Sequence, residues 1–154
     1  MTLLAAADGV VNASSPLPWL VVGGQLSAPQ LTALHAAGVR TVIDLRDAME
    51  PRPFDEPGTA ATLGMHYVNA PVVSGALTDQ AMERVLAALR AARPTPTLLH
   101  CSSANRTGGP LIAYLMIDEG MDQASAVDAA MRGGLRSVEI LEWGTEYAGR
   151  HRKN

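Results

Sequence analysis

The 154-residue sequence predicts a single α/β domain with a central, mostly parallel sheet of about four to five strands flanked by helices. Three observations predict this fold class. Short runs of β-branched and aliphatic residues alternate with longer segments that repeat with helical periodicity. Polar capping residues precede several helical segments, and glycines follow them. Hydrophobic residues make up 47% of the chain and charged residues 18%, which is typical of a globular domain and not of a disordered chain.

The first strand–helix–strand unit lies in the N-terminal third of the chain. Residues 19–22 form a short aliphatic run that predicts the first strand. Ser27 is expected to cap the helix that follows, with Gln30 completing a capping box, and Gly38 is expected to end it. The β-branched run 41–45 predicts the second strand.

The middle of the chain predicts two further strands separated by the clearest helix. Three prolines make residues 48–58 a loop, because proline lacks a backbone donor. A short helix before Gly64 leads to a third strand at 66–68. Thr78 is expected to cap an amphipathic helix, and the apolar run 97–99 predicts a buried central strand. The apolar stripe of that helix consists of Met82, Val85, Leu86 and Leu89.

The C-terminal third is expected to be helical. A buried helix around residues 111–116 is expected to stop at Gly120. Asp122 is expected to cap another helix over 124–132, which ends at a pair of glycines.

The sequence contains no repeat, low-complexity tract or linker, so we expect one domain over residues 1–154. Its core is expected over about 19–135, with 1–18 as an N-terminal extension and 137–154 as a C-terminal helix and tail. At this size a domain buries most of its apolar surface without cross-links.

Charge and cysteine content exclude several function classes. A formal net charge of −3 argues against a nucleic-acid or anionic-membrane surface. No apolar stretch approaches the roughly 20 residues that cross a bilayer, and the start of the chain lacks the basic residues of a secretory signal. We expect a cytoplasmic protein, because a single cysteine makes no intramolecular disulfide and a free reactive thiol suits a reducing compartment. We also expect no metal ion and no cofactor, because no cysteine–histidine cluster has metal-ligand spacing. The oligomeric state is left open.

The most informative segment, Leu98 to Gly108, places the single cysteine between the expected central strand and a glycine-rich helix start. A helix N-terminus and a nearby cation lower the pKa of a cysteine thiol and stabilise bound anions. Cys101 is therefore the candidate nucleophile. Arg106, whose planar fork matches two oxygens of a phosphoryl or sulfuryl group, is the candidate oxyanion binder. The alternative is an inert buried thiol, since cysteine is often a core residue.

The residues around this pair supply the expected binding loop. Thr107 is also expected to donate its hydroxyl to the thiolate. His100 is expected either to orient the loop by hydrogen bonding or to be a satisfied core histidine. Asp44 and Arg46, at the end of the second strand, are expected to form an ordinary ion pair or a loop contact, with support of the site as the alternative. The candidate oxyanion-binding residues are Ser102, Ser103, Ala104, Asn105 and Thr107.

These residues resemble a known signature. His100-Cys101 and Asn105-Arg106-Thr107-Gly108, with the flanking strand and helix, resemble the cysteine-dependent tyrosine and dual-specificity phosphatase superfamily. The segments 23–27, 42–46 and 71–75 are similar to its bacterial beta-lactamase-hydrolase-like branch, whose members are called phosphatases or sulfurtransferases. The resemblance runs from about residue 19 to residue 135 and implies a sheet flanked by helices, with Cys101 as nucleophile and Arg106 as oxyanion binder.

The sequence departs from the pattern of that superfamily at three points. Four residues separate Cys101 from Arg106, where the usual phosphatase loop has five. Ala104 stands where the branch usually has glycine, although alanine is poorer at positive φ. Ser74 aligns with the aspartate that serves related phosphatases as a general acid. Asp79 is a possible substitute, with a surface acid at a helix start as the alternative.

Three functions follow as hypotheses. The leading one is a phosphatase-like hydrolase, of the tyrosine or dual-specificity kind, that acts on a small-molecule or protein phosphate ester through a thiophosphoryl intermediate on Cys101. The second is a rhodanese-like sulfurtransferase that forms a persulfide on Cys101, favoured by the short loop and the missing acid. The third is a non-catalytic module that binds an oxyanion or a protein.

Overall fold

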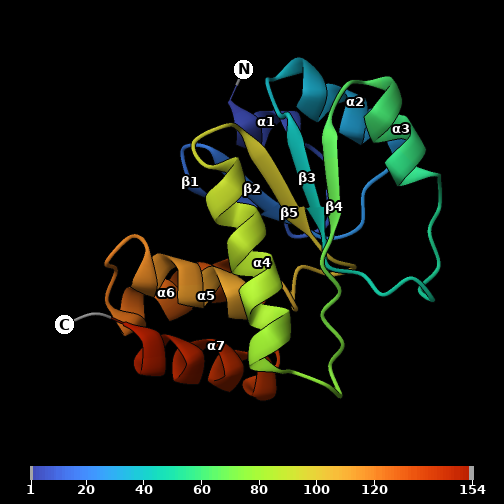
Figure 1. Cartoon of the computed structure of the whole chain (residues 1–154). Helices are drawn as coiled ribbons and strands as arrows, with labels where there is room; N and C mark the ends of the chain where they lie inside the picture. Colours follow the sequence, from blue (N-terminus) through green and yellow to red (C-terminus); the bar gives the residue numbers. More distant parts are fainter. Residues whose placement is uncertain (1, 153–154) are drawn as a thin grey trace.

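The structure is a computed structural model that describes residues 2–152. Its centre is a five-stranded sheet in the order β1-β2-β5-β3-β4 (Figure 1). Only β1 runs antiparallel to its neighbour, and the other strands are parallel. The predicted α/β class with a mostly parallel sheet is confirmed. The strands are β1 (Ser14–Leu17), β2 (Leu20–Gly23), β3 (Thr41–Asp44), β4 (His66–Asn69) and β5 (Thr97–His100).

Helices cover both faces of the sheet, and alternate residues of the central strands divide the core into two parts. Val21, Val42 and Leu98 pack with the N-terminal helices, whereas Val22, Ile43 and Leu99 pack with the C-terminal ones. This alternation is the period of two of a strand buried on both faces. The first group of helices is α1 (Leu3–Ala6), α2 (Ala28–Ala36) and α3 (Glu56–Thr62); the second is α4 (Asp79–Ala92), α5 (Gly108–Ile117), α6 (Gln123–Arg132) and α7 (Val138–His151).

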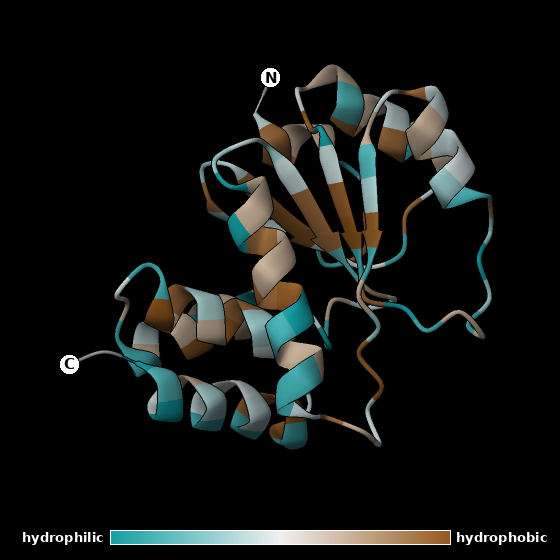
Figure 2. Ribbon diagram, viewed as in Figure 1, coloured by the Kyte–Doolittle hydropathy of each residue, from teal (hydrophilic) through white to brown (hydrophobic). Residues whose placement is uncertain are grey.

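Residue hydropathy follows this layering. Figure 2 shows brown, hydrophobic residues along the central strands and teal, hydrophilic residues on the outer faces of α4 and α7. Within residues 108–116 of α5 every residue is buried. A helix that is apolar all round belongs in the interior, which is why α5 lies between the sheet and the outer helices.

The predicted helix starts are confirmed at three positions. The Ser27 hydroxyl accepts from the Gln30 amide while the Gln30 side chain accepts from the Ser27 amide, which completes the capping box. Without a capping box, the Thr78 side chain accepts from the Ala81 amide at the start of α4, and the Asp122 side chain accepts from the Ser125 amide at the start of α6. These signals are local in sequence, so they survive in the folded chain.

The segment before residue 19 contributes more than an extension. It forms α1 and the edge strand β1, and neither has a repeating pattern long enough to predict from sequence. At the other end, Trp143 of α7 packs against α5 and donates its indole N–H to the Thr78 carbonyl. Across the part of the chain that the structure describes, no helix has the length and apolarity needed to cross a bilayer.

Candidate active site

The candidate nucleophile follows the central strand of the sheet. Cys101 comes directly after β5, which is flanked by β2 and β3, and its thiol is buried. The loop that follows enters α5 at Gly108, with Thr107 as its N-cap. In parallel sheets the carboxyl ends of the strands form the usual ligand site, so topology alone puts the thiol there.

A close backbone contact holds this loop against the end of β2. The Gln25 amide donates to the Ser102 carbonyl at 2.8 Å. A Cβ atom at Gly24 would lie 2.5 Å from that same carbonyl oxygen. Glycine at position 24 therefore permits an approach that no other residue allows.

The carbonyl groups of residues 101 to 104 all have partners outside the loop centre. The Cys101 carbonyl faces His100 Nδ1 at 3.2 Å, and the Ser103 carbonyl accepts from the Asn12 amide group at 2.9 Å. The Ala104 carbonyl accepts from the Thr107 hydroxyl at 2.9 Å, and the Ser102 carbonyl accepts from Gln25.

Because these carbonyl groups point to partners outside the loop, the N–H groups of the same peptides point in the opposite direction. In a trans peptide the C=O and the following N–H point in opposite directions. The amides of residues 102 to 105 therefore face away from those partners, and no group within residues 2–152 accepts a hydrogen bond from them. Four amides without an acceptor, ahead of a helix N-terminus, are the kind of donors that bind an anion.

Arg106 completes the cradle, and Glu50 fixes its orientation. Its two terminal nitrogens donate to the Glu50 carboxylate at 2.6 and 2.7 Å, and they also reach the Val72 carbonyl and the Ser102 hydroxyl. The Arg106 hydrogen bonds lower the pKa of Glu50 to about 2, despite its partial burial, so this carboxyl is ionised at neutral pH. The hydrogen bonds of Glu50 and the neighbouring Cys101 raise the pKa of Arg106, although burial lowers it, so the guanidinium stays charged beside the thiol.

Two other predicted loop residues act on the loop itself. The Thr107 hydroxyl bonds the Ala104 carbonyl, so the expectation that it donates to the thiolate is wrong. It holds the last turn before α5 instead. The Asn105 side chain accepts from the amides of Arg136 and Ser137 and so ties the loop to the start of α7.

Ala104 adopts the conformation that glycine favours. Its φ is +68°, and it is 1% exposed. A left-handed conformation costs a residue with a Cβ roughly 1–2 kcal/mol. The loop therefore keeps a glycine-type turn although the residue is alanine.

Within the described residues, neither Ser74 nor Asp79 forms a hydrogen bond with residues 101 to 106. Ser74 is exposed in the loop between β4 and α4, two residues beyond the Val72 carbonyl that contacts Arg106. Asp79, at the start of α4, is exposed and accepts both hydrogen bonds of an Arg150 fork at 2.6 and 2.8 Å. This partner lowers the pKa of Asp79, which keeps the carboxyl ionised at neutral pH and leaves it no proton to donate as a general acid. The segment between Ala70 and Thr78 contains no carboxyl group at all.

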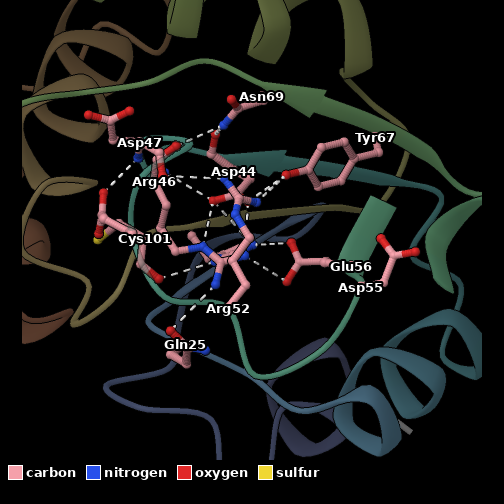
Figure 3. Close-up of polar contacts among 12 residues, drawn as sticks. Gln25, Asp44, Arg46, Asp47, Arg52, Asp55, Glu56, Tyr67, Asn69 and Cys101 are labelled. Atoms are coloured by element: carbon pink, nitrogen blue, oxygen red, sulfur yellow. Dashed lines mark hydrogen bonds and ion pairs between the residues drawn. The ribbon is translucent and has the colours of Figure 1, made fainter. Parts of the chain in front are cut away.

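Behind the loop lies a buried network of charged side chains that the sequence pattern did not predict as a unit (Figure 3). Asp44 and Arg46 do pair as expected, but both are buried and Arg46 Nη2 donates to Glu56 as well. Burial raises the pKa of Asp44, yet the hydrogen bonds of Arg46, the charge of His100 and the hydroxyl of Tyr67 outweigh it and lower the pKa to about 2. The Tyr67 pKa rises to about 12 because of burial and the neighbouring Asp44.

Asp44, Glu56 and His100 have ligand atoms within 4.8 Å of one another, a grouping that could hold a metal ion. Arg46, however, already supplies a cation to both carboxylates, at 2.9 and 3.2 Å. A metal ion would have to displace a buried guanidinium, so the donor set fits a salt-bridge network better than a metal site.

Glu50 and Glu56 are the functional candidates that sequence reasoning missed. Both lie in or beside the proline-rich segment 48–58, more than 40 residues before the loop that they contact. The only available signal was an acidic residue within that segment, and a charge in a loop is ordinarily solvated.

Comparison with known proteins agrees with the geometry. The family model described as DSP-PTPase phosphatase fused to NAD+ kinase matches residues 7–145. The dual specificity protein phosphatase TpbA of Pseudomonas aeruginosa (strain UCBPP-PA14) is 27% identical over 147 residues, which cover 92% of this chain and 63% of TpbA. The chain thus spans less than two thirds of the length of this curated relative.

Solved structures share the fold. A DUF442 protein from Shewanella putrefaciens CN-32 superposes with a TM-score of 0.82 at 21% identity, covering 97% of this chain and 99% of that one. P. aeruginosa TpbA, solved as a cysteine-to-serine variant in complex with pTyr, has a TM-score of 0.70 at 22% identity, covering 90% of this chain and 83% of that one. At these identities the likeness establishes the fold alone.

Proposed function

The chain belongs to the family described as DSP-PTPase phosphatase fused to NAD+ kinase, and from this premise we propose that it hydrolyses phosphate esters with Cys101 as nucleophile. The observation that carries the proposal is the run of four amides without an acceptor, at residues 102 to 105, between the only cysteine and Arg106. Such a cradle matches the three equatorial oxygens of a phosphoryl group in transfer.

The proposed reaction has two steps. The Cys101 thiolate attacks phosphorus, a sulfur–phosphorus bond forms, and the bond from phosphorus to the ester oxygen breaks. The leaving alkoxide or phenoxide takes a proton from solvent. Water then attacks phosphorus, the sulfur–phosphorus bond breaks, and inorganic phosphate leaves as the thiolate is restored and the water proton passes to solvent. Arg106 and the amides of residues 102 to 105 hold the charge that develops on the phosphoryl oxygens.

The carboxyl groups around the site favour aryl esters as substrates. Glu50 is ionised, Asp79 is held by Arg150, and segment 70–78 contains no acid. A phenol has a pKa of about 10, so phenoxide departs without an acid far more readily than an alkoxide. We therefore propose a phosphotyrosine-like aryl phosphate, small or protein-borne, as the substrate class. A reducing compartment such as the cytoplasm is part of this proposal, because the thiol must stay reduced.

A second candidate function is sulfur transfer through a Cys101 persulfide. The four-residue spacing between Cys101 and Arg106, and the absence of an acid in segment 70–78, favour it. Sulfur transfer from thiosulfate needs an anion cradle and a thiolate but no acid for an alcohol leaving group.

One set of assays tests the proposal. Release of phosphate from p-nitrophenyl phosphate and from an alkyl phosphate is measured beside cyanide-dependent turnover of thiosulfate, with Cys101→Ser as control. We expect aryl phosphate hydrolysis that disappears in C101S. Thiosulfate turnover without phosphate release refutes the hydrolase and supports the transferase, while activity on neither substrate supports a non-catalytic binding module.

A gain-of-function variant tests the role of the missing acid. Ser74→Asp places a carboxyl group at the position where the resembling phosphatases carry one. We expect it to raise the alkyl phosphate rate by about tenfold or more while changing the aryl phosphate rate less, since a positioned acid contributes typically 10²–10⁴-fold. Ala76→Asp, on the same exposed loop, is the matched control and should raise neither rate. An equal gain in both variants would mean that added charge, not acid position, is responsible.

A further inference from the structure

Glu56 makes a buried contact with the residue that precedes the nucleophile. It is the first residue of α3, is fully buried, and lies 2.6 Å from His100 Nε2 through one oxygen and 3.2 Å from Arg46 Nη2 through the other. Figure 3 shows Glu56 pointing from its helix into the charged network. A buried carboxylate destabilises the folded protein unless it is paired, so Glu56 needs the contacts with both His100 and Arg46.

Both ring nitrogens of His100 face oxygen acceptors. Nδ1 lies 3.2 Å from the Cys101 carbonyl, which can only accept, and Nε2 faces Glu56. Arg46 bonds the second oxygen of Glu56, and Asp44 Oδ1 lies 3.8 Å from His100 Nε2, so the ring faces two carboxylates whose negative charge attracts a cation. A neutral imidazole carries a single N–H, so the ring can donate to both oxygens only when both of its nitrogens carry a proton.

The His100 ring in turn sets the first peptide of the binding loop. Because Nδ1–H holds the Cys101 carbonyl, the Ser102 amide on the other side of that peptide points away from His100 and stays without an acceptor. The charge of the ring also lies next to the nucleophile in the chain, where a cation stabilises a thiolate.

We propose that Glu56 is a positioning residue for the reaction at Cys101: it keeps His100 doubly protonated, and His100 thereby fixes the loop and supports the thiolate. This inference rests on the proposed function for its role in catalysis, although its effect on the thiol is measurable without a substrate. Several charged and titratable groups face the His100–Cys101 unit. On the side of His100, directly or through Asp44, they are Glu56 from α3, Asp44 from β3, Arg46 and Arg52 from the segment after β3, and Tyr67 from β4. On the side of the thiol they are Glu50 and Arg106.

The test uses the fact that Cys101 is the only cysteine, so alkylation by iodoacetamide reports this thiol alone. Rates are measured by mass spectrometry from pH 5 to pH 9 for wild type, Glu56→Gln and Glu56→Asp. We expect Glu56→Gln to react about tenfold more slowly than wild type at pH 6 and at the same rate at pH 9, where the thiolate forms without help. Glu56→Asp keeps the charge and should follow wild type. Tyr67→Phe, which removes a hydrogen bond to Asp44 without touching His100, is the matched control and should stay within about twofold.

A second readout observes the His100 ring directly. Nitrogen-15 NMR of the wild-type imidazoles, assigned with His100→Asn, should show both nitrogens of His100 protonated at pH 7, and Glu56→Gln should remove one of these protons. Wild-type His100 with a bare ring nitrogen at pH 7, or Glu56→Gln alkylation equal to wild type at every pH, overturns the proposal.

The two proposals fail in different ways. If wild type hydrolyses no phosphate ester but Glu56→Gln still changes the alkylation profile, the proposed function is wrong and the positioning role stands. If wild type hydrolyses p-nitrophenyl phosphate and Glu56→Gln retains its kcat, KM and pH profile, only the positioning role is wrong.

Discussion

The helix that carries the binding loop rests on α7 through two glycines, and this contact leads to a quantitative prediction. A Cβ atom at Gly144 would lie 2.6 Å from the Gly109 carbonyl oxygen and 3.1 Å from its Cα, both backbone atoms that cannot rotate aside. Overpacking of this kind costs typically 1–3 kcal/mol. Replacing a helical glycine by alanine also gains about 1 kcal/mol of helix propensity. The net cost is therefore up to about 2 kcal/mol, and because the clash is with backbone atoms we expect Gly144→Ala to lower the free energy of unfolding by an amount in the upper half of that range, about 1–2 kcal/mol.

Gly149 on the same helix provides a matched control. It is exposed, and a Cβ there would meet no atom within 4 Å. Gly149→Ala should therefore stabilise the protein by up to about 1 kcal/mol from propensity alone. For a domain of this size 1 kcal/mol corresponds to roughly 2–4 °C in Tm, so the two variants should move Tm in opposite directions.

The assay is urea and thermal unfolding followed by circular dichroism, with p-nitrophenyl phosphate hydrolysis measured beside it. Because Gly109 is the second residue of α5, spreading the helices also displaces the binding loop. We expect kcat to fall several-fold in Gly144→Ala and to stay unchanged in Gly149→Ala. A Gly144→Ala protein at least as stable as Gly149→Ala would refute the steric reasoning.

Three further predictions concern charged groups. Arg106→Lys should lower kcat/KM for an aryl phosphate by at least about 100-fold with an unchanged circular dichroism spectrum, because an ammonium cannot reproduce the fork; a loss below tenfold would contradict the assigned role. Asp44 has a pKa of about 2 in the folded protein against an ordinary 3.8. Because the pKa of Asp44 is lower in the folded protein than in the unfolded chain, the ionised carboxylate stabilises the folded protein above pH 4, and this stabilisation is lost as the pH falls through about 2. Urea unfolding at pH 7, 4 and 2 should show this loss of about 2 kcal/mol, and its absence would mean that Asp44 is not so paired. Asp79→Asn should leave the aryl phosphate rate within about twofold, since Arg150 already holds that carboxylate, and a tenfold loss would make Asp79 the general acid.

Much of the fold could be predicted because its signals are local. The capping residues Ser27, Thr78 and Asp122 bond amides three residues away, so their effect depends on nothing distant. Apolar runs likewise located four of the five strands within about one residue. The edge strand β1 was missed, because its four residues include Ser14, Ser15 and a proline and are mostly half-buried. Such a strand forms because β2 offers it a partner, not because of its own pattern.

The binding loop shows the same division. Cys101 and Arg106 could be selected from residue type and spacing, and positive φ at Ala104 could be anticipated from the glycine that resembling loops carry. The partners that orient these residues could not be predicted from the sequence. Thr107 bonds a carbonyl and not the thiolate, a choice between two acceptors that depends on the path of the turn.

The sequence by itself determined the alternation of strands and helices, the place of the thiol between a strand and a helix N-terminus, and the arginine beside it. Those features depend on hydrophobic periodicity and on spacings of a few residues. Only the tertiary structure decided which way the loop amides face and which carboxylates control the site. Glu50 reaches Arg106 across 56 residues and Glu56 reaches His100 across 44, and such pairs form only after the sheet brings distant segments together. Burial then makes them strong, because water no longer competes for their charges.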